Sequence, residues 1–157
     1  MEAQNIEAEK RAWIILVADD QPMILQYVST VLEKSGYKVL TAPTGEEALL
    51  KSRAFDGEID LLLSNIQMPG MTGMDLGTSI IQERPSIKVV IMAGFRSGML
   101  VLDHSWHFLQ KPFIPSQLRE IIAGMLLLPP NPSLDGPPSP NLEEPTIGSR
   151  PVLAAEV

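Results

Sequence analysis

The residues of this chain that could carry out chemistry are two adjacent aspartates, an asparagine and a lysine, and each follows a short, mostly apolar segment. They are Asp19-Asp20, Asn65 and Lys111. Two neighbouring carboxylates repel one another unless a cation lies near them, so the acid pair predicts either Mg²⁺ or the ammonium group of Lys111 close by. A solvated acidic turn would explain the aspartates alone. It does not explain a Lys-Pro-Phe sequence after another apolar segment, so the combination favours a functional site.

Five short apolar segments alternate with longer amphipathic ones, a pattern typical of β-α-β units around a mostly parallel sheet. The carboxyl ends of such strands meet in one crevice, which would bring the acid pair, Asn65 and Lys111 together. Ser64 would point away from that crevice, because side chains alternate along a strand. The predicted strands cover residues 13–18, 37–42, 60–64, 88–92 and 106–110. The predicted helices lie at 24–32, after Thr44, at 73–84, within 96–105 and from 115 onward.

Composition limits the class of protein. At 157 residues, with 45% hydrophobic and 20% charged side chains, the chain can build one core of ordinary size. It has no cysteine, which excludes disulfides and thiolate metal sites. The formal charge of −7 and the absence of a basic cluster argue against nucleic-acid binding. No apolar run approaches the ~20 residues of a membrane span, so we expect no membrane contact and a cytoplasmic protein.

The chain divides into three parts. Residues 1–12 form an N-terminal extension and residues 13–127 form the single domain. Eight of the fourteen prolines fall within 129–157, so we expect residues 128–157 to be a Pro-rich, disordered tail. That tail is too short for a DNA-binding domain, and we therefore expect a stand-alone domain.

Residues 13–127 resemble the receiver domain of bacterial two-component response regulators. The resemblance rests on three stretches in the same order: Asp19-Asp20 after an apolar strand, the sequence DLLLSNIQMPGMTG at 60–73, and FLQKPF at 108–113. It implies an α/β, flavodoxin-like (βα)5 fold with a doubly wound parallel sheet and strand order 2-1-3-4-5. It also implies that an aspartate after the third strand accepts a phosphoryl group from a histidine kinase with the help of Mg²⁺.

The position of the implied phosphoryl acceptor is Asn65, and an amide is not a useful acceptor. The implied metal ligands are Asp20, Asn65 and the backbone carbonyl of Gln67, with Asp19 acting through water. Because an amide replaces a carboxylate, Mg²⁺ should bind weakly if at all. Lys111 would supply a cation to the pocket, and we expect a hydrogen bond between Asn65 and Lys111.

Two further positions concern the output of the domain. The family has a threonine or serine after the fourth strand, where this chain has Ala93, and Phe108 occupies the implied switch position. The resemblance assigns partner binding, or pairing with a second copy, to the face made by the fourth helix, fifth strand and fifth helix. The predicted fourth helix, within 96–105, is short, which should change the partner or the dimer geometry. The resemblance also implies a cis bond between Lys111 and Pro112.

The leading hypothesis is a signalling protein that acts by protein contact, is not an enzyme, and is deficient in phosphorylation or independent of it. One alternative is an engineered Asp-to-Asn form of an ordinary receiver, which is less favoured because Ala93 departs from the pattern as well. A second is a small Mg²⁺-dependent phosphohydrolase that uses Asp19 or Asp20 as nucleophile. A third is a module that binds a small ligand without phosphorylation.

Overall fold

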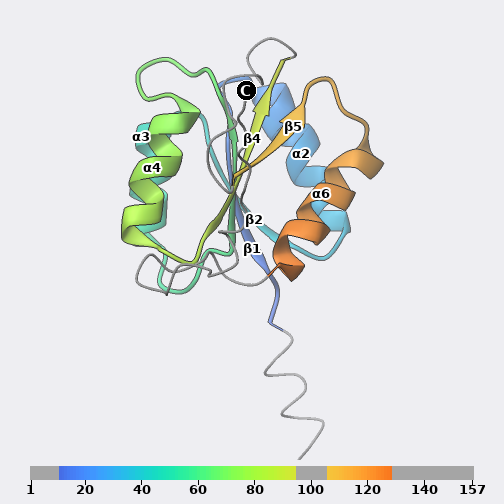
Figure 1. Cartoon of the computed structure of the whole chain (residues 1–157), viewed down its shortest axis with the longest axis horizontal. Coiled ribbons are helices and arrows are strands. Elements are labelled where there is room, and N and C mark those ends of the chain that lie inside the picture. Colours follow the sequence, from blue (N-terminus) through green and yellow to red (C-terminus); the bar gives the residue numbers. More distant parts are fainter. Residues whose placement is uncertain (1–10, 95–105, 129–157) are drawn as a thin grey trace, which may run out of the picture.

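The computed structural model describes residues 11–94 and 106–128, which form a five-stranded sheet with helices on both faces (Figure 1). The strand order is β2-β1-β3-β4-β5, and every neighbouring pair is parallel. The strands are β1 (Ile14–Ala18), β2 (Lys38–Ala42), β3 (Leu61–Asn65), β4 (Lys88–Ala93) and β5 (His107–Gln110). The predicted fold class and strand order are therefore confirmed.

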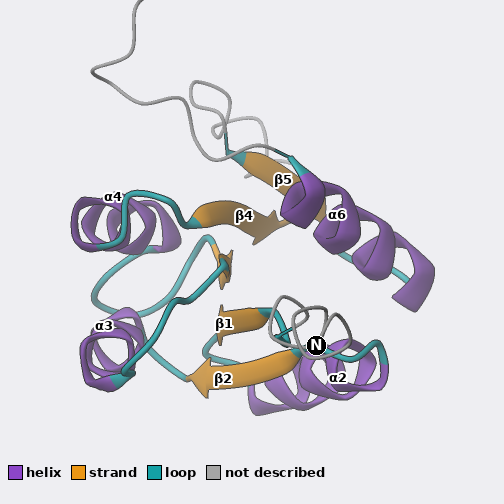
Figure 2. Cartoon of the chain, turned by 90° about the horizontal axis from the view of Figure 1, so that it is seen from below, coloured by secondary structure: helices purple, strands orange, loops and turns teal. Residues whose placement is uncertain are grey.

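Four described helices cover the two faces of the sheet. They are α2 (Pro22–Lys34), α3 (Gly45–Ala54), α4 (Gly73–Glu83) and α6 (Pro115–Leu127). Figure 2 shows α3 and α4 on one side of the sheet and α2 and α6 on the other. The helix predicted within 96–105 lies outside the described residues.

The core consists of two apolar layers, one on each face of the sheet, because alternate residues of the central strands point to opposite sides. In β1, Leu16 faces the layer beneath α3 and α4, whereas Ile15 and Val17 face the layer beneath α2 and α6. All three are fully buried. A buried side chain of this size contributes about 1.5–3 kcal/mol, so the central strands form a firm base for the loops at their ends.

The helices begin where the sequence offers capping groups. At α3 the hydroxyl of Thr44 accepts a hydrogen bond from the backbone N–H of Glu47, which confirms the predicted start. At α4 the capping box is complete: the Thr72 hydroxyl accepts from the N–H of Asp75, and the Asp75 carboxylate accepts from the N–H of Thr72. This second box, which was not predicted from the sequence, fixes the start of α4 next to the end of β3.

Each strand differs from its predicted bounds by one residue at one end or at both. The third strand extends to Asn65, which is in register with Met92, and the fourth extends to Ala93. The first strand begins at Ile14, and Trp13 before it is 40% exposed. Asn65 is therefore the last residue of β3, and its backbone is held by the sheet ladder.

Candidate functional site

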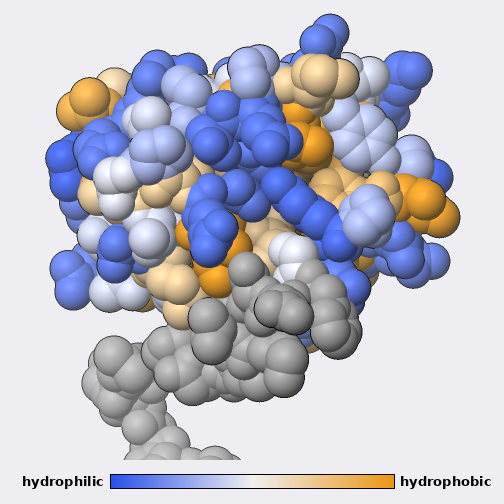
Figure 3. Space-filling view, turned by 90° about the horizontal axis from the view of Figure 1, so that it is seen from above, coloured by the Kyte–Doolittle hydropathy of each residue, from blue (hydrophilic) through white to orange (hydrophobic). Residues whose placement is uncertain are grey.

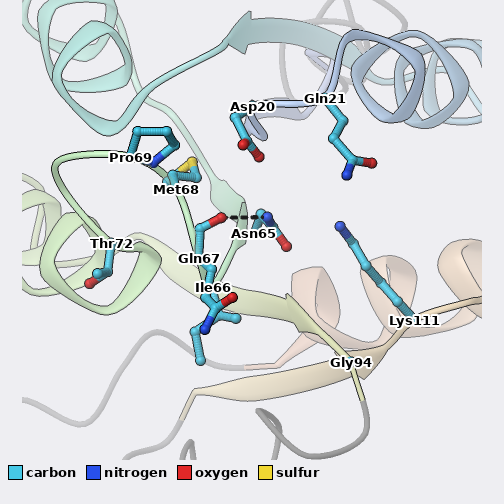
Figure 4. Close-up of a pocket in the computed structure, with 10 residues that line it drawn as sticks. All are labelled: Asp20, Gln21, Asn65, Ile66, Gln67, Met68, Pro69, Thr72, Gly94 and Lys111. Atoms are coloured by element: carbon cyan, nitrogen blue, oxygen red, sulfur yellow. Dashed lines mark hydrogen bonds between the residues drawn. The ribbon is translucent and has the colours of Figure 1, made fainter.

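The site is an open pocket of about 620 Å³ at the carboxyl ends of the strands. Hydrophilic side chains gather over the middle of this end of the molecule (Figure 3). The lining residues are the last residue of β3 and residues of the segments that follow β1, β3, β4 and β5 (Figure 4). They are Asp20, Gln21, Asn65, Ile66, Gln67, Met68, Pro69, Thr72, Gly94 and Lys111. The structure thus gathers Asp20, Asn65 and Lys111 at one pocket, as the strand ends predict.

Lys111 forms an ion pair with the buried aspartate of the acid pair. Its Nζ lies 3.1 Å from Oδ2 of Asp19, whose side chain is fully buried. The other carboxylate oxygen of Asp19 accepts a hydrogen bond of 2.9 Å from the backbone N–H of Gln21. The charge of Asp19 is therefore compensated on both oxygens. The bond between Lys111 and Pro112 is cis, as expected.

The two adjacent aspartates occupy different environments. Asp19 is fully buried beneath the pocket, whereas Asp20 is exposed and lines it. Water solvates the carboxylate of Asp20, and the ammonium group of Lys111 stabilises that of Asp19. The repulsion expected between two bare carboxylates is thereby relieved.

Asn65 points into the pocket and bonds to its own loop. Its Nδ2 donates a hydrogen bond of 2.7 Å to the backbone carbonyl of Gln67 (Figure 4). Among the described residues no hydrogen bond joins Asn65 and Lys111, so the expected bond between them is wrong (Figure 4). The physical reason is that Asp19, a full negative charge, holds the ammonium group, while the turn after β3 brings the Gln67 carbonyl within reach of the amide. Ser64 is fully buried and donates to the backbone carbonyl of Asn65, away from the pocket.

Three residues of the site were not singled out from the sequence. Gln21 and Thr72 line the pocket, and Gly73 allows the start of α4 to approach β3. A Cβ on Gly73 would lie 2.2 Å from the backbone oxygen of Asn65. The glycine that follows a capping threonine is the sequence signal that could have indicated this close approach.

The residues expected at the output side lie in β4 and β5. Ala93 is buried at the end of β4, and its carbonyl accepts a hydrogen bond of 2.8 Å from the N–H of Lys111. Its methyl group brings no hydroxyl to the pocket. Phe108 is half-buried in β5 and packs on the layer beneath α3 and α4. The predicted fourth helix of the partner-binding face, within 96–105, lies outside the described residues, so the role of Phe108 stays a prediction.

The residues present fit Mg²⁺ poorly. The three expected ligands, Asp20, Asn65 and the carbonyl of Gln67, line the same pocket. However, the Asn65 amide already bonds to the Gln67 carbonyl, and Asp20 is the one carboxylate among the lining residues. Within residues 11–94 and 106–128, no group of three or more His, Cys, Asp or Glu side chains is arranged to hold a metal ion. Mg²⁺ prefers an octahedron of oxygens that includes carboxylates.

No helix within the described residues is long and apolar enough to cross a lipid bilayer.

Comparison with known proteins gives the same assignment over most of the chain. The family model of the response regulator receiver domain matches residues 15–123. Sensor kinase CckA of Brucella abortus is 30% identical over 116 residues, which are 71% of this chain and 12% of that protein. The DNA-binding transcriptional regulator NtrC of a Bradyrhizobium strain is 32% identical over 119 residues, 73% of this chain and 24% of that protein. The chain thus spans a quarter or less of the length of these curated relatives.

Solved structures of isolated receiver domains match over nearly their whole length. A response regulator receiver domain protein from Clostridium thermocellum superposes with a TM-score of 0.67 at 30% identity, covering 73% of this chain and 94% of that one. The chemotaxis response regulator CheY4 of Vibrio cholerae gives a TM-score of 0.64 at 27% identity, covering 73% and 99%. The chain belongs to the response regulator receiver domain family.

Proposed function

We propose that this chain is a receiver that signals through protein contacts and does not accept a phosphoryl group at residue 65. The proposal rests on the identity and the position of the Asn65 side chain. It reaches into the pocket from the end of β3, and its amide is hydrogen-bonded to the Gln67 carbonyl. An amide is a far weaker nucleophile than a carboxylate, so in-line phosphoryl transfer has no acceptor there.

The other oxygen groups of the pocket do not replace the missing acceptor. The Asp19 carboxylate is fully buried and bonded to Lys111 and to the N–H of Gln21. Asp20 is exposed and solvated. The hydroxyl of Ser64 is buried on the far side of β3. Lys111 keeps the position of a phosphoryl-binding cation, but Ala93 supplies no hydroxyl to bind a phosphoryl oxygen.

An apolar hollow beside the pocket supports contact with another protein. It measures about 360 Å³ and lies between α2 and the loop that follows β5. Tyr27 and Phe113 stack at 5.9 Å within it, and Met23 and Ile114, nearby in sequence, are 80% and 58% exposed. An apolar hollow with polar residues at its rim favours contact with another protein.

The proposed partners are a histidine kinase or another cytoplasmic signalling protein, and a second copy of this chain through the face that includes β5 and α6. The proposal includes no catalytic turnover, no DNA contact and no membrane contact. The absence of a hydroxyl at Ala93, together with Asn65, supports a naturally phosphorylation-independent receiver over an engineered Asp-to-Asn form.

The test is phosphorylation by a small-molecule donor. The full chain, whose intact mass is first checked for hydrolysis of the Asn65 amide, is incubated with acetyl phosphate and Mg²⁺. The unaltered chain should keep its mass, and an Asn65→Asp variant should gain one phosphoryl group. A Gln26→Glu variant, which adds the same charge on the exposed side of α2, should gain none.

Two results would contradict the proposal. One is phosphoryl labelling of the unaltered chain at Asn65 or Ser64. The other is turnover of a generic phosphomonoester that disappears in an Asp19→Ala variant, which would establish the phosphohydrolase instead.

A further inference from the structure

The loop between β3 and α4 carries a side-chain hydrogen bond at its start, in the pocket, beside the backbone bond from the N–H of Gly73 to the carbonyl of Ile66 that joins its two ends. Nδ2 of Asn65 lies 2.7 Å from the backbone oxygen of Gln67. A backbone carbonyl can only accept, so the NH₂ group of the amide faces it and the amide oxygen is directed elsewhere. The last residue of β3 is thereby tied directly to the loop that leads to α4.

The same contact with a carboxylate would be unfavourable. An aspartate at this position would bring two oxygen acceptors within hydrogen-bonding distance with no proton between them. Two negatively polarised oxygens at that spacing require a cation between them or must separate. The amide of Asn65 removes this requirement because it supplies the donor itself.

The other charged groups near Asn65 also attract a cation only weakly. Lys111 neutralises Asp19 at 3.1 Å, and the backbone N–H of Gln21 bonds to its other oxygen. Asp20 is the carboxylate that lines the pocket, and it is exposed to water. One solvated carboxylate beside an ammonium group gives a weak field for a divalent ion that gives up its water reluctantly.

We infer that the Asn65 amide takes the structural place of a metal ion, fastening the β3–α4 loop so that neither folding nor pocket geometry depends on Mg²⁺. The inference rests on the proposed function, because it explains how a receiver without an acceptor keeps its loop ordered. It specifies the regulation of the site: a change in Mg²⁺ concentration does not switch this chain.

The test is thermal unfolding of the full chain in EDTA, in MgCl₂ and in NaCl of equal ionic strength. The melting temperature of the unaltered chain should be the same in MgCl₂ and NaCl. An Asn65→Asp variant should be less stable in EDTA and should recover in MgCl₂. At a Mg²⁺ concentration ten times its Kd, the ratio of folded to unfolded Asn65→Asp chain should rise about tenfold.

Two controls separate charge from hydrogen bonding. Gln26→Glu adds one carboxylate away from the pocket and should show no response specific to Mg²⁺. Asn65→Ala removes the hydrogen bond without adding charge, so it should be less stable than the unaltered chain in all three solutions and should not respond to Mg²⁺.

Three results would overturn the inference: stabilisation of the unaltered chain by Mg²⁺ beyond that of NaCl, an Asn65→Asp variant as stable in EDTA as the unaltered chain, or an Asn65→Ala variant of unchanged stability. None of them requires phosphorylation. Phosphoryl labelling of the unaltered chain would refute the proposed function alone, and a response to Mg²⁺ without labelling would refute this inference alone.

Discussion

Two lysines at opposite ends of the sheet show how the molecule uses the same side chain in different ways. At the carboxyl end, Lys111 pairs with the buried carboxylate of Asp19 at the edge of an open pocket. At the amino end, Lys88 is itself buried, and its Nζ donates to the carbonyls of Met125 at 3.0 Å and Leu128 at 2.9 Å. Met125 lies in the last turn of α6, and Leu128 is the residue that follows the helix.

The difference lies in what each ammonium group contacts. Lys88 bonds to backbone carbonyls at the negative end of a helix, which fixes α6 to the start of β4 and leaves no charge available to a ligand. Lys111 bonds to a side chain, and part of it stays accessible from the pocket. In this molecule the lysine with an acidic partner and a cavity beside it belongs to the candidate site, and the lysine bonded to helix-end carbonyls has a structural role.

The largest expected effect is at the carboxyl end, where α4 approaches β3. Replacing Gly73 by alanine would place a Cβ 2.2 Å from the Asn65 carbonyl, and because that neighbour is backbone it cannot move aside cheaply. We expect Gly73→Ala to lower the free energy of unfolding by about 3 kcal/mol, measured by urea titration. Gly124→Ala is the matched control, because nothing lies within 4 Å of its Cβ position.

Gly124→Ala should raise the free energy of unfolding by about 0.5–1 kcal/mol, because alanine favours a helix interior more than glycine does. Equal effects of the two substitutions would show that the close approach at Gly73 is absent.

The next largest effect on stability should distinguish Asp19 from Asp20. Asp19→Ala removes the partner of Lys111 and the acceptor for the N–H of Gln21, so the free energy of unfolding should fall by about 2 kcal/mol. Asp20→Ala removes an exposed carboxylate and should change the free energy of unfolding by no more than about 0.5 kcal/mol. The measurement is the same urea titration at neutral pH. A larger loss for Asp20→Ala would mean that Lys111 pairs with Asp20 instead.

The smallest effect is at the amino end and depends on pH. Lys88→Met keeps the apolar stem and removes two hydrogen bonds, so at pH 7 it should cost about 1 kcal/mol. Burial lowers the pKa of Lys88 below its ordinary value of 10.5, and the charge of Asp60 opposes that shift. The unfolded state therefore binds more protons than the folded state between the lowered pKa and 10.5, so stability rises with pH in that window.

The unaltered chain should therefore become more stable relative to Lys88→Met as the pH rises through that window toward 10.5, so the difference between their free energies of unfolding should grow. Urea titrations at several pH values measure the difference. Lys34→Met, at an exposed position of α2, is the control for general effects of alkaline pH. A difference that shrinks as the pH rises would show that burial does not lower the pKa of Lys88.

The sequence predicted the sheet and the convergence of the site well, because both follow from local patterns. Alternating apolar segments predicted five parallel strands, and the strand ends predicted that Asp20, Asn65 and Lys111 share a pocket. Two features could not be predicted, because they depend on distances between atoms that the spacing of residues along the sequence does not determine. One is the choice of Lys111 between Asp19 and Asn65, and the other is the turn that brings the Gln67 carbonyl to the amide.

The roles of Gly73 and Lys88 were missed for a related reason. A glycine at a helix start and a lysine at a strand start are common on protein surfaces, and only the packing of α4 and α6 makes them special. The helix predicted within 96–105 lies outside the described residues, so that prediction stays open.

The most direct test of the account is a crystal structure of the unaltered chain grown with MgCl₂. We expect Nδ2 of Asn65 to stay near 2.7 Å from the Gln67 carbonyl and Nζ of Lys111 to stay near 3.1 Å from Oδ2 of Asp19. An octahedral ion bonded to Asp20, Asn65 and the Gln67 carbonyl at about 2.0–2.1 Å would contradict it.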